Sequence, residues 1–234
     1  MNLTVLKKSQ RGFMDGHDFK GYPLFSNGAR GTIRPNNFGA LYVFNDDYLL
    51  PNAYVGLHPH ANTEIVTIQL EGAQNHKDNF GYEQRLDAGA VQLISSGLGI
   101  QHAGGNVSEQ TPARHLQIWI APAVGDTKPT IQLKPPTVPI RQNQWESLVS
   151  PDGSDDSLRI QQNAWILRGR FEEGPIAYGL HKSGNGVMIY VLEGKILVDQ
   201  TTADQEDTLF ITDAETVNLL VKEPVSLVLI ETVL

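Results

Sequence analysis

The sequence of 234 residues contains no cysteine. Disulfide bonds, thiolate catalysis and cysteine-bound zinc are therefore excluded, so any metal site has to use histidine, carboxylate or other ligands. The lack of cysteine is compatible with a reducing compartment, and we expect a cytoplasmic protein.

Long hydrophobic runs and an excess of basic residues are also missing. Met1–Lys8 holds no apolar stretch of the length of a signal peptide, and no run in the chain approaches the roughly 18 residues that cross a membrane. The formal net charge is −8, whereas surfaces that bind nucleic acids are usually basic. We therefore expect no membrane segment and no direct contact with nucleic acid, while binding to another protein stays open.

What the chain does contain is short strands and turns. The 22 glycines and 13 prolines are spread along the sequence, which is typical of many short strands joined by turns. Ile65–Leu70 and His115–Ile120 have the composition and alternation of strands, whereas Asn45–Asp47 is predicted to be a turn. Gln142–Val149 is predicted to be a short helical turn inside a proline-rich linker over residues 123–155. The predicted fold class is all-β, a sandwich or a barrel.

The densest group of candidate ligands lies just before one of these strands. Residues two apart in an extended strand point to the same side, so His58 and His60 project together, and Asn62 and Glu64 share that side if the strand stays regular. Two imidazoles and a carboxylate are suitable ligands for a divalent transition metal. The alternative is a pair of surface histidines in a turn-rich segment, which this motif alone does not exclude.

The second half of the chain repeats this segment. Gly56–Gly72 and Gly179–Gly194 both begin Gly-Leu-His and both end with an apolar strand followed by Leu-Glu-Gly. The positions of His60, Glu64 and His102 are taken in the second copy by Ser183, Gly186 and Leu219. Because the strands are duplicated and the candidate ligands are kept in one copy, we expect the second half to be a scaffold.

These residues resemble the two motifs of the cupin superfamily and, more closely, those of the pirins. The similarity is carried by His58-Pro59-His60 with Glu64, by His76-Lys77-Asp78, and by Gly97-x-Gly99-Ile100-x-His102. It implies a bicupin, in which two antiparallel β-barrels face each other and helices are few and short. Residues 1–125 are then the N-terminal barrel with the metal site, and residues 126–234 are the C-terminal barrel without metal ligands.

The resemblance also implies a resident metal. Carried over to this chain, the family's histidine ligands are His58, His60 and His102. Pirins usually hold iron, so one divalent transition metal is expected, Fe(II) first, with Ni, Cu, Mn or Zn as alternatives.

One position departs from the family pattern. The family's fourth ligand is a glutamate two residues after the third histidine, and this chain has Gly104 there. Glu64 is therefore the candidate for the fourth ligand and for the catalytic base, because other cupins use that motif position as a ligand. Glu64 could instead support the ligands or face solvent, and Gln101 and Asn106 are further candidates for the vacant role.

The remaining histidines and tryptophans are expected to be structural. Hydrogen-bonded structural roles are expected for His76 and His115, and His181 corresponds to the first ligand without its partners. Core or barrel-interface positions are expected for the three tryptophans, Trp119, Trp145 and Trp165.

The functional expectation follows from the pirin resemblance. It implies an oxidoreductase of the quercetin 2,3-dioxygenase type, acting on a flavonol or related small aromatic substrate. Gly104 leaves open whether the chain is an enzyme. The alternatives are a non-catalytic, metal-dependent or redox-sensing regulatory protein that binds a protein partner, and a metal-free degenerate bicupin.

Overall fold

The regular structure is almost entirely β-strand, as predicted. The computed structural model describes residues 1–26, 34–137 and 141–234. In these ranges the helices are two 3₁₀ turns, η1 (Lys8–Gln10) and η2 (Ser154–Asp156). No helix of the described residues is long and apolar enough to cross a membrane.

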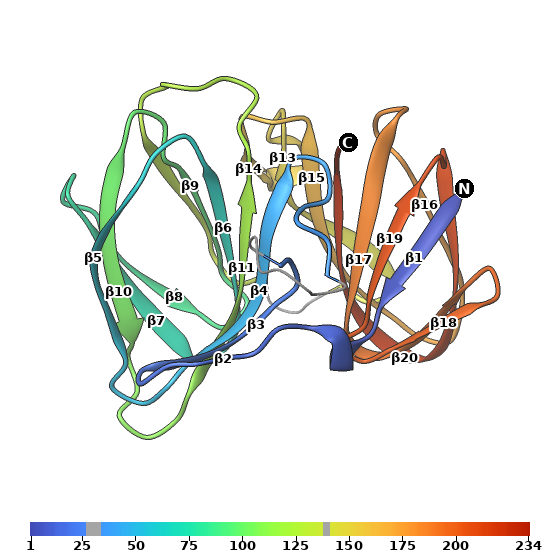
Figure 1. The fold of residues 1–234 in the computed structure, drawn as a ribbon, viewed down its shortest axis with the longest axis horizontal. Coiled ribbons are helices and arrows are strands. Elements are labelled where there is room, and N and C mark those ends of the chain that lie inside the picture. Colours follow the sequence, from blue (N-terminus) through green and yellow to red (C-terminus); the bar gives the residue numbers. More distant parts are fainter. Residues whose placement is uncertain (27–33, 138–140) are drawn as a thin grey trace.

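The N-terminal half forms a barrel from two sheets that face each other (Figure 1). Its strands are β2 (Met14–Asp15), β3 (Phe19–Pro23), β4 (Leu41–Leu49), β5 (Tyr54–His60), β6 (Glu64–Glu71), β7 (Ala73–Asp78), β8 (Glu83–Asp87), β9 (Val91–Ser95), β10 (Ile100–Asn106), β11 (Ala113–Ile120) and β12 (Thr130–Lys134). The outer sheet has the order β5-β10-β7-β8, and the inner, seven-stranded sheet has the order β12-β9-β6-β11-β4-β3-β2.

The C-terminal half is a second barrel, made from one nine-stranded sheet. Its strands are β1 (Asn2–Leu6), β13 (Gln144–Ser150), β14 (Leu158–Arg159), β15 (Ala164–Phe171), β16 (Gly174–Gly179), β17 (Asn185–Val198), β18 (Thr201–Asp204), β19 (Thr208–Thr212) and β20 (Thr216–Val233). The two longest strands, β17 and β20, each bend and so contribute to both faces of the barrel. The register shifts of this pair and the positive φ of 83° at Gly194 lie at the bend.

The strand pairing confirms the predicted duplication. Ile65 of β6 lies opposite Ile94 of β9, as Val187 of β17 lies opposite Ile211 of β19. β10 pairs with β5 and β7, as the first part of β20 pairs with β16 and the second part of β17. Two facing barrels with few short helices are the expected bicupin.

Two local predictions were wrong. Asn45–Asp47 is not a turn, because β4 runs without a break from Leu41 to Leu49 and pairs with both β3 and β11. Gln142–Val149 is not helical, because Gln144–Ser150 forms β13 against β15. Pairing along sheet edges satisfies backbone groups that a single isolated helical turn leaves open to solvent.

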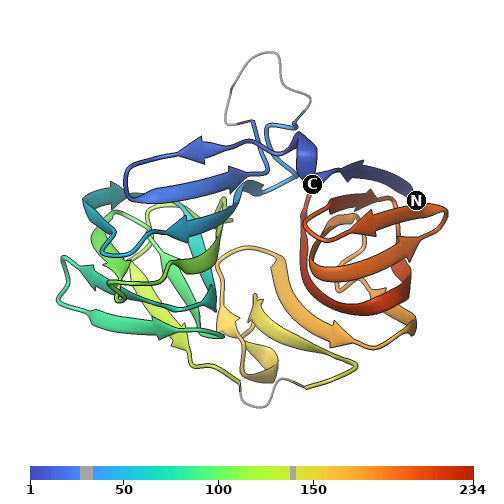
Figure 2. The same cartoon turned by 90° about the horizontal axis from the view of Figure 1, so that it is seen from below.

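The strand pairing crosses the boundary predicted between residues 125 and 126. Strand β1, at the start of the chain, pairs with β19 of the C-terminal barrel, and Figure 2 shows it beside that barrel. Strand β12, which follows the predicted boundary, pairs with β9 of the N-terminal barrel. The predicted linker over residues 123–155 thus contains two strands, and its residues 138–140 lie outside the described ranges.

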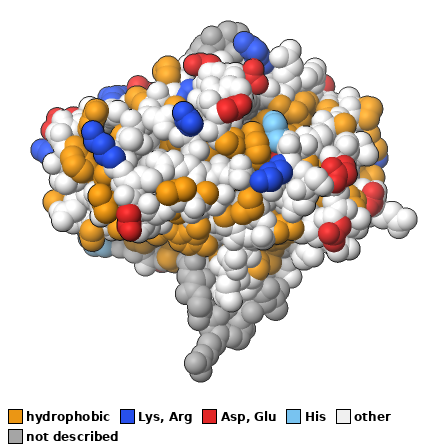
Figure 3. All heavy atoms as spheres, turned by 90° about the horizontal axis from the view of Figure 1, so that it is seen from above, with side chains coloured by type: hydrophobic (Ala, Val, Ile, Leu, Met, Phe, Trp, Pro, Cys, Tyr) orange, Lys and Arg blue, Asp and Glu red, His pale blue; other side chains and the backbone are white. Residues whose placement is uncertain are grey.

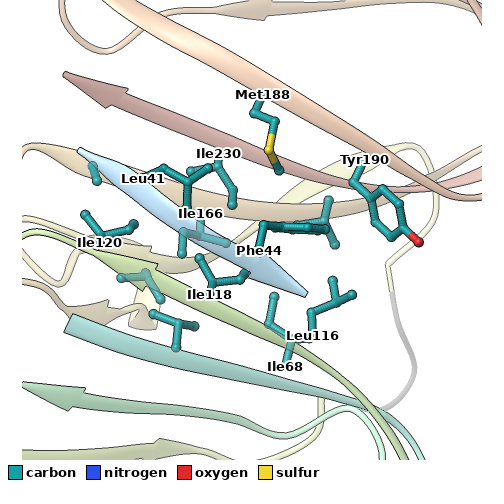
Figure 4. Packing of buried hydrophobic residues seen from close by; sticks show 14 of the residues in the cluster. Leu41, Phe44, Ile68, Leu116, Ile118, Ile120, Ile166, Met188, Tyr190 and Ile230 are labelled. Carbon is teal, nitrogen blue, oxygen red and sulfur yellow. The ribbon is translucent and has the colours of Figure 1, made fainter. Parts of the chain in front are cut away.

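The two barrels share a hydrophobic core. Phe44 of β4 and Ile118 of β11 face Met188 of β17 and Ile230 of β20 (Figure 4), and all four are fully buried. The predicted alternation of His115–Ile120 is confirmed, because Leu116, Ile118 and Ile120 form one apolar face and belong to this core. One side of β6 and β11 therefore lies in the interface between the two barrels, and their other side faces the interior of the N-terminal barrel.

The surface carries charges of both signs. On the face shown in Figure 3, basic side chains are scattered among acidic and hydrophobic ones. On this face the basic side chains are separated from one another, whereas surfaces that bind nucleic acids usually gather them.

Candidate metal centre

Three histidines from two neighbouring strands meet at one end of the N-terminal barrel. His58 and His60 lie two apart on β5, and His102 lies on β10 directly opposite His58. One ligand atom from each side chain lies within 4.8 Å of the others. Over the residues described, this is the one group of three or more histidine, aspartate or glutamate side chains that could hold a metal ion.

The charge state of the cluster suits a cation. Burial and the neighbouring imidazoles lower the pKa of His102 to about 3, and burial followed by the charge of His58 lowers the pKa of His60. Both imidazoles are therefore neutral at pH 7 and present a lone pair. The Nε2 atom of His102 is buried and has no hydrogen-bond partner within the described ranges. An orphaned buried nitrogen of His102, grouped with the imidazoles of His58 and His60, is a suitable donor set for a divalent transition metal.

A backbone contact selects the ligating nitrogen of His58. Its Nδ1 lies 2.8 Å from the carbonyl oxygen of Gly56. A carbonyl oxygen only accepts, so Nδ1 carries the proton and Nε2 is left with the lone pair. The backbone of β5 itself thus fixes the imidazole in the tautomer that a metal requires.

Trp119 supports the cluster from the inner sheet. Its ring lies edge-on to His60, with the ring centroids 4.9 Å apart, and packs against Ile65, Ile94 and Ile100. The expectation of a core position therefore holds for Trp119, but this core borders the histidines. Trp145 and Trp165 pack against the core of the C-terminal barrel, as expected.

Glu64 lies outside the three-histidine group. Its side chain is 1% exposed, and its Oε2 accepts hydrogen bonds from the Ser95 hydroxyl and the Gln161 backbone N–H. Asn62, with a positive φ of 51°, turns the chain between β5 and β6, so the alternation that places His58 and His60 together does not extend to Glu64. Burial raises the pKa of Glu64, and both hydrogen bonds oppose that rise.

The backbone around Gly104 is adapted to glycine. A Cβ atom at Gly104 would lie 2.2 Å from the carbonyl oxygen of Asn75 on the neighbouring strand. The register of β10 against β5 also shifts between His102 and Gly104. A side chain at this position requires a backbone movement, and this applies to the glutamate that the family resemblance implies here.

The two other candidates for the fourth ligand have other roles or positions. The side-chain amide of Asn106 donates to the carbonyl oxygens of Leu49, Leu50 and Thr111. Gln101 precedes His102 on β10 and is exposed, so strand alternation directs it to the other face of the sheet.

The two buried histidines of this barrel, His76 and His115, differ from each other. His76 is buried, lies 3.4 Å from Asp78 through Nε2, and has its ring centroid 5.3 Å from that of His102. The hydrogen-bonded role expected for His76 agrees with this contact. His115 is also buried, but its Nδ1 has no hydrogen-bond partner among the residues described. For His115 the expected hydrogen bond through Nδ1 is therefore not found.

A cavity of about 250 Å³ lies between the two sheets beside the histidines. His58, His76 and His102 line it from the outer sheet. Five polar residues line it from the inner sheet: Asp47, Thr67, Gln92, His115 and Gln117. None of the five was predicted from the sequence to be a site residue, and a structural role was expected for His115. A sequence signal that could have identified them is the presence of polar residues at alternate positions of apolar strands. The second copy of the repeat has hydrophobic residues at those positions.

The corresponding end of the C-terminal barrel is filled by a closed hydrogen-bond network. The carboxylate of Glu231, 0% exposed, accepts from the hydroxyl of Tyr178, the amide of Asn185 and the backbone N–H groups of His181 and Lys182. His181 Nδ1 also lies 3.1 Å from this carboxylate, and its ring stacks on Trp165 at 4.7 Å. These contacts hold a loop in place, as expected for a first-ligand position without its partners.

Comparison with known proteins agrees with this architecture. Residues 23–120 match the family model described as Pirin, and residues 147–232 match the one described as Quercetinase C-terminal cupin domain. A pirin-like protein of Caulobacter vibrioides is 34% identical over 84% of this chain and 86% of its own length. The chain belongs to the pirin family.

Two further similar proteins come from Escherichia coli. A quercetin 2,3-dioxygenase of Escherichia coli K12 is 31% identical over 78% of each chain. The crystal structure of the bacterial pirin YhhW of Escherichia coli in complex with nickel(II) superposes with a TM-score of 0.90, at 26% identity and 99% coverage of both chains.

Proposed function

We propose that the chain is a metal-dependent oxidoreductase of the quercetin 2,3-dioxygenase type, acting on flavonols or related aromatic molecules. The observation that carries the proposal is the three-histidine group, with ligand atoms within 4.8 Å of one another, at the edge of a cavity in the N-terminal barrel. The enzyme named in a relative that is 31% identical supports the reaction class.

His58, His60 and His102 would hold the metal. We propose Fe(II), with Ni(II), Cu(II), Mn(II) or Zn(II) as alternatives, because imidazole nitrogens suit most of these ions. Such a metal supplies Lewis-acid and redox chemistry for the reaction of a catecholic or flavonol substrate with dioxygen.

The protein's own contribution is orientation and shielding. Gly56 fixes the tautomer of His58, and Trp119 limits the orientation of His60. Leu49 and Leu86 contribute apolar surface to the cavity, which excludes water from a bound aromatic ring.

Glu64 has a structural role in this proposal. Its carboxylate joins β9 to Gln161 at the junction with the C-terminal barrel. We infer that His58, His60 and His102 would be the protein ligands of a bound metal and that Glu64 would not be one.

The test is reconstitution under anaerobic conditions with each metal in turn, followed by addition of quercetin and dioxygen. We expect flavonol consumption and ring-cleaved product with at least one metal, and loss of both in His58→Ala. His181→Ala is the matched control from the second barrel and should keep activity. Verified full metal occupancy with no turnover for any metal would contradict the enzymatic proposal.

A second function is favoured by Gly104. A site without the family's carboxylate lacks its nearest proton acceptor, which suits a metal-dependent or redox-sensing protein that binds a protein partner. This alternative predicts a stoichiometric partner that is captured by the metal-loaded protein and lost in His58→Ala.

A further inference from the structure

Two rows of polar residues cross the inner sheet where it borders the N-terminal cavity. In the first row Asp47 of β4 lies opposite His115 of β11, which lies opposite Gln69 of β6. The second row runs across four strands. Its members, in spatial order, are Asn45 of β4, Gln117 of β11, Thr67 of β6 and Gln92 of β9.

The five members that line the cavity, Asp47, Thr67, Gln92, His115 and Gln117, are called the polar wall below. Three of them are at least 95% buried: Thr67 and His115 are 5% exposed and Gln92 is 3% exposed. Buried polar groups normally find hydrogen-bond partners, since leaving one unpaired costs stability.

Asp47 and His115 each have one atom that does not satisfy this rule, while Oδ2 of Asp47 accepts from the side-chain amide of Asn45 at 3.4 Å. Buried Oδ1 of Asp47 and buried Nδ1 of His115 have no hydrogen-bond partner in the described parts of the chain. The two residues are direct cross-strand neighbours, so their side chains project from the same face of the sheet toward the cavity. A pair of adjacent, unpaired polar atoms in the wall of a cavity is a candidate binding site.

The fold itself does not require a polar lumen. In the C-terminal barrel the corresponding rows are Gly169–Leu227–Val191 and Leu167–Leu229–Ile189–Leu209. All members of the second row are hydrophobic and are buried in that barrel's core. The same topology is therefore stable with an apolar interior, and the polar wall needs a functional explanation.

The chemistry of the wall specifies the ligand group. Burial lowers the pKa of His115 to about 4, so its imidazole is neutral at pH 7 and has one N–H and one lone pair. Burial raises the pKa of the neighbouring Asp47 to about 7, so near pH 7 this group accepts hydrogen bonds as a carboxylate and can also donate one as a carboxylic acid. A hydroxyl group donates one hydrogen bond and accepts others, so it can satisfy both neighbours at once.

We propose that the polar wall binds a hydroxyl group on the part of the substrate that points away from the metal, and so selects polyhydroxylated aromatic molecules over their unsubstituted analogues. This inference rests on the proposed function for the position of the metal-binding end of the substrate. Asp47 and His115 are then specificity-determining residues, and Gln92 and Gln117 extend the same surface.

The first test compares two flavonols that share the same metal-chelating group. 3-Hydroxyflavone has only the chelating hydroxyl, and quercetin adds hydroxyls on both ring systems. Anaerobic titration of the Ni(II)-loaded protein should give a quercetin affinity about 10- to 100-fold higher, since hydrogen-bonding sites reject analogues that lack the group. The test variant is His115→Leu, because the second barrel has Leu227 at the equivalent position. It should reduce the quercetin preference by about tenfold or more and leave 3-hydroxyflavone binding unchanged.

A control variant in the second barrel, Leu227→Met, should leave both affinities unchanged. The thermal midpoint of each variant checks folding, and removal of an unpaired buried nitrogen in His115→Leu should not lower it. Equal binding of the two flavonols to the wild-type protein, or an unchanged preference in His115→Leu, would overturn the proposal.

A second measurement separates this inference from the proposed function. Resorcinol added to the diamagnetic Zn(II)-loaded protein should shift the imidazole NMR signals of His115, and toluene should not. If flavonols are neither bound nor turned over but resorcinol still shifts His115, the dioxygenase proposal fails and the polar wall stands. If resorcinol and toluene give the same result, the polar wall is not a hydroxyl site, whatever the activity.

Discussion

The two barrels of this protein have one topology and opposite interiors. In the N-terminal barrel the strand rows facing the lumen carry Asp47, His115, Gln117 and Thr67, and three histidines gather at one end. In the C-terminal barrel the equivalent rows are apolar and pack as a continuous core. The comparison separates what the fold needs from what the site needs.

The fold needs only the alternation of buried and exposed residues along each strand. Both barrels satisfy it on the side that faces the other barrel, where Phe44 and Ile118 meet Met188 and Ile230. The unpaired polar groups of the N-terminal lumen lower stability rather than raise it. Because the described strand rows are polar in one lumen and apolar in the other, we infer that the first lumen binds a ligand and that the second barrel contributes stability.

The largest effect is expected when a metal-ligating histidine is replaced by the residue at the equivalent position of the second barrel. His102→Leu places in the first barrel the residue that the second barrel has at Leu219. Metal affinity should fall by about 100-fold or more, because one of three imidazoles is lost and even indirect support is worth 10- to 100-fold. Elemental analysis of protein without a histidine tag measures the loss. His181→Leu is the control and should retain the metal; equal metal content in the two variants would show that the histidine cluster is not the site.

A smaller effect is expected at Gly104. The second barrel has Val221 at the equivalent position, whereas a Cβ at Gly104 would meet the Asn75 carbonyl oxygen at 2.2 Å. Gly104→Ala should lower the free energy of unfolding by about 2 kcal/mol, measured by urea denaturation. Gly179→Ala, which has nothing within 4 Å of its Cβ, should change it by less than about 0.5 kcal/mol. No difference between these variants would mean that β10 can accept a side chain, and with it the family's glutamate.

The smallest effect concerns Asp47 and depends on pH. Burial raises the pKa of Asp47 from 3.8 to about 7, so the folded chain keeps a proton that the unfolded chain has already lost. The stability linked to this proton is fully present below pH 3.8 and is lost as the pH rises through about 7.

Asp47→Asn, which cannot ionise, should therefore be more stable than the wild type at pH 8 by about 1 to 2 kcal/mol. The two proteins should be equally stable near pH 4. Urea unfolding at both pH values measures this, with exposed Asp15→Asn as the control. If Asp47→Asn were more stable than the wild type by the same amount at both pH values, the result would contradict a raised pKa for a buried Asp47 carboxyl.

Much of this comparison could be read from the sequence. The alternation of Ile65–Leu70 and the repeated Gly-Leu-His and Leu-Glu-Gly segments predicted duplicated strands, and the pairing confirms them. The meeting of His58, His60 and His102 also followed from spacing and the family motif, since β5 and β10 are neighbours in the structure.

The rest depended on backbone geometry that residue types do not reveal. Asn45–Asp47 has the composition of a turn, but flanking strands extend β4 through it and direct Asp47 into the lumen. Glu64 was expected beside the histidines by strand alternation, and the positive φ of Asn62 interrupts that alternation. A single left-handed residue thus decides which face a carboxylate occupies.

The central claim is that one barrel holds a metal and its duplicate does not. Anomalous diffraction from crystals of the untagged protein soaked with Ni(II) tests it most directly. The expected result is one strong peak per chain, within bonding distance of His58, His60 and His102, and none beside His181 and Glu231. A peak in the C-terminal barrel, or no peak at the three histidines at saturating Ni(II), would contradict the account.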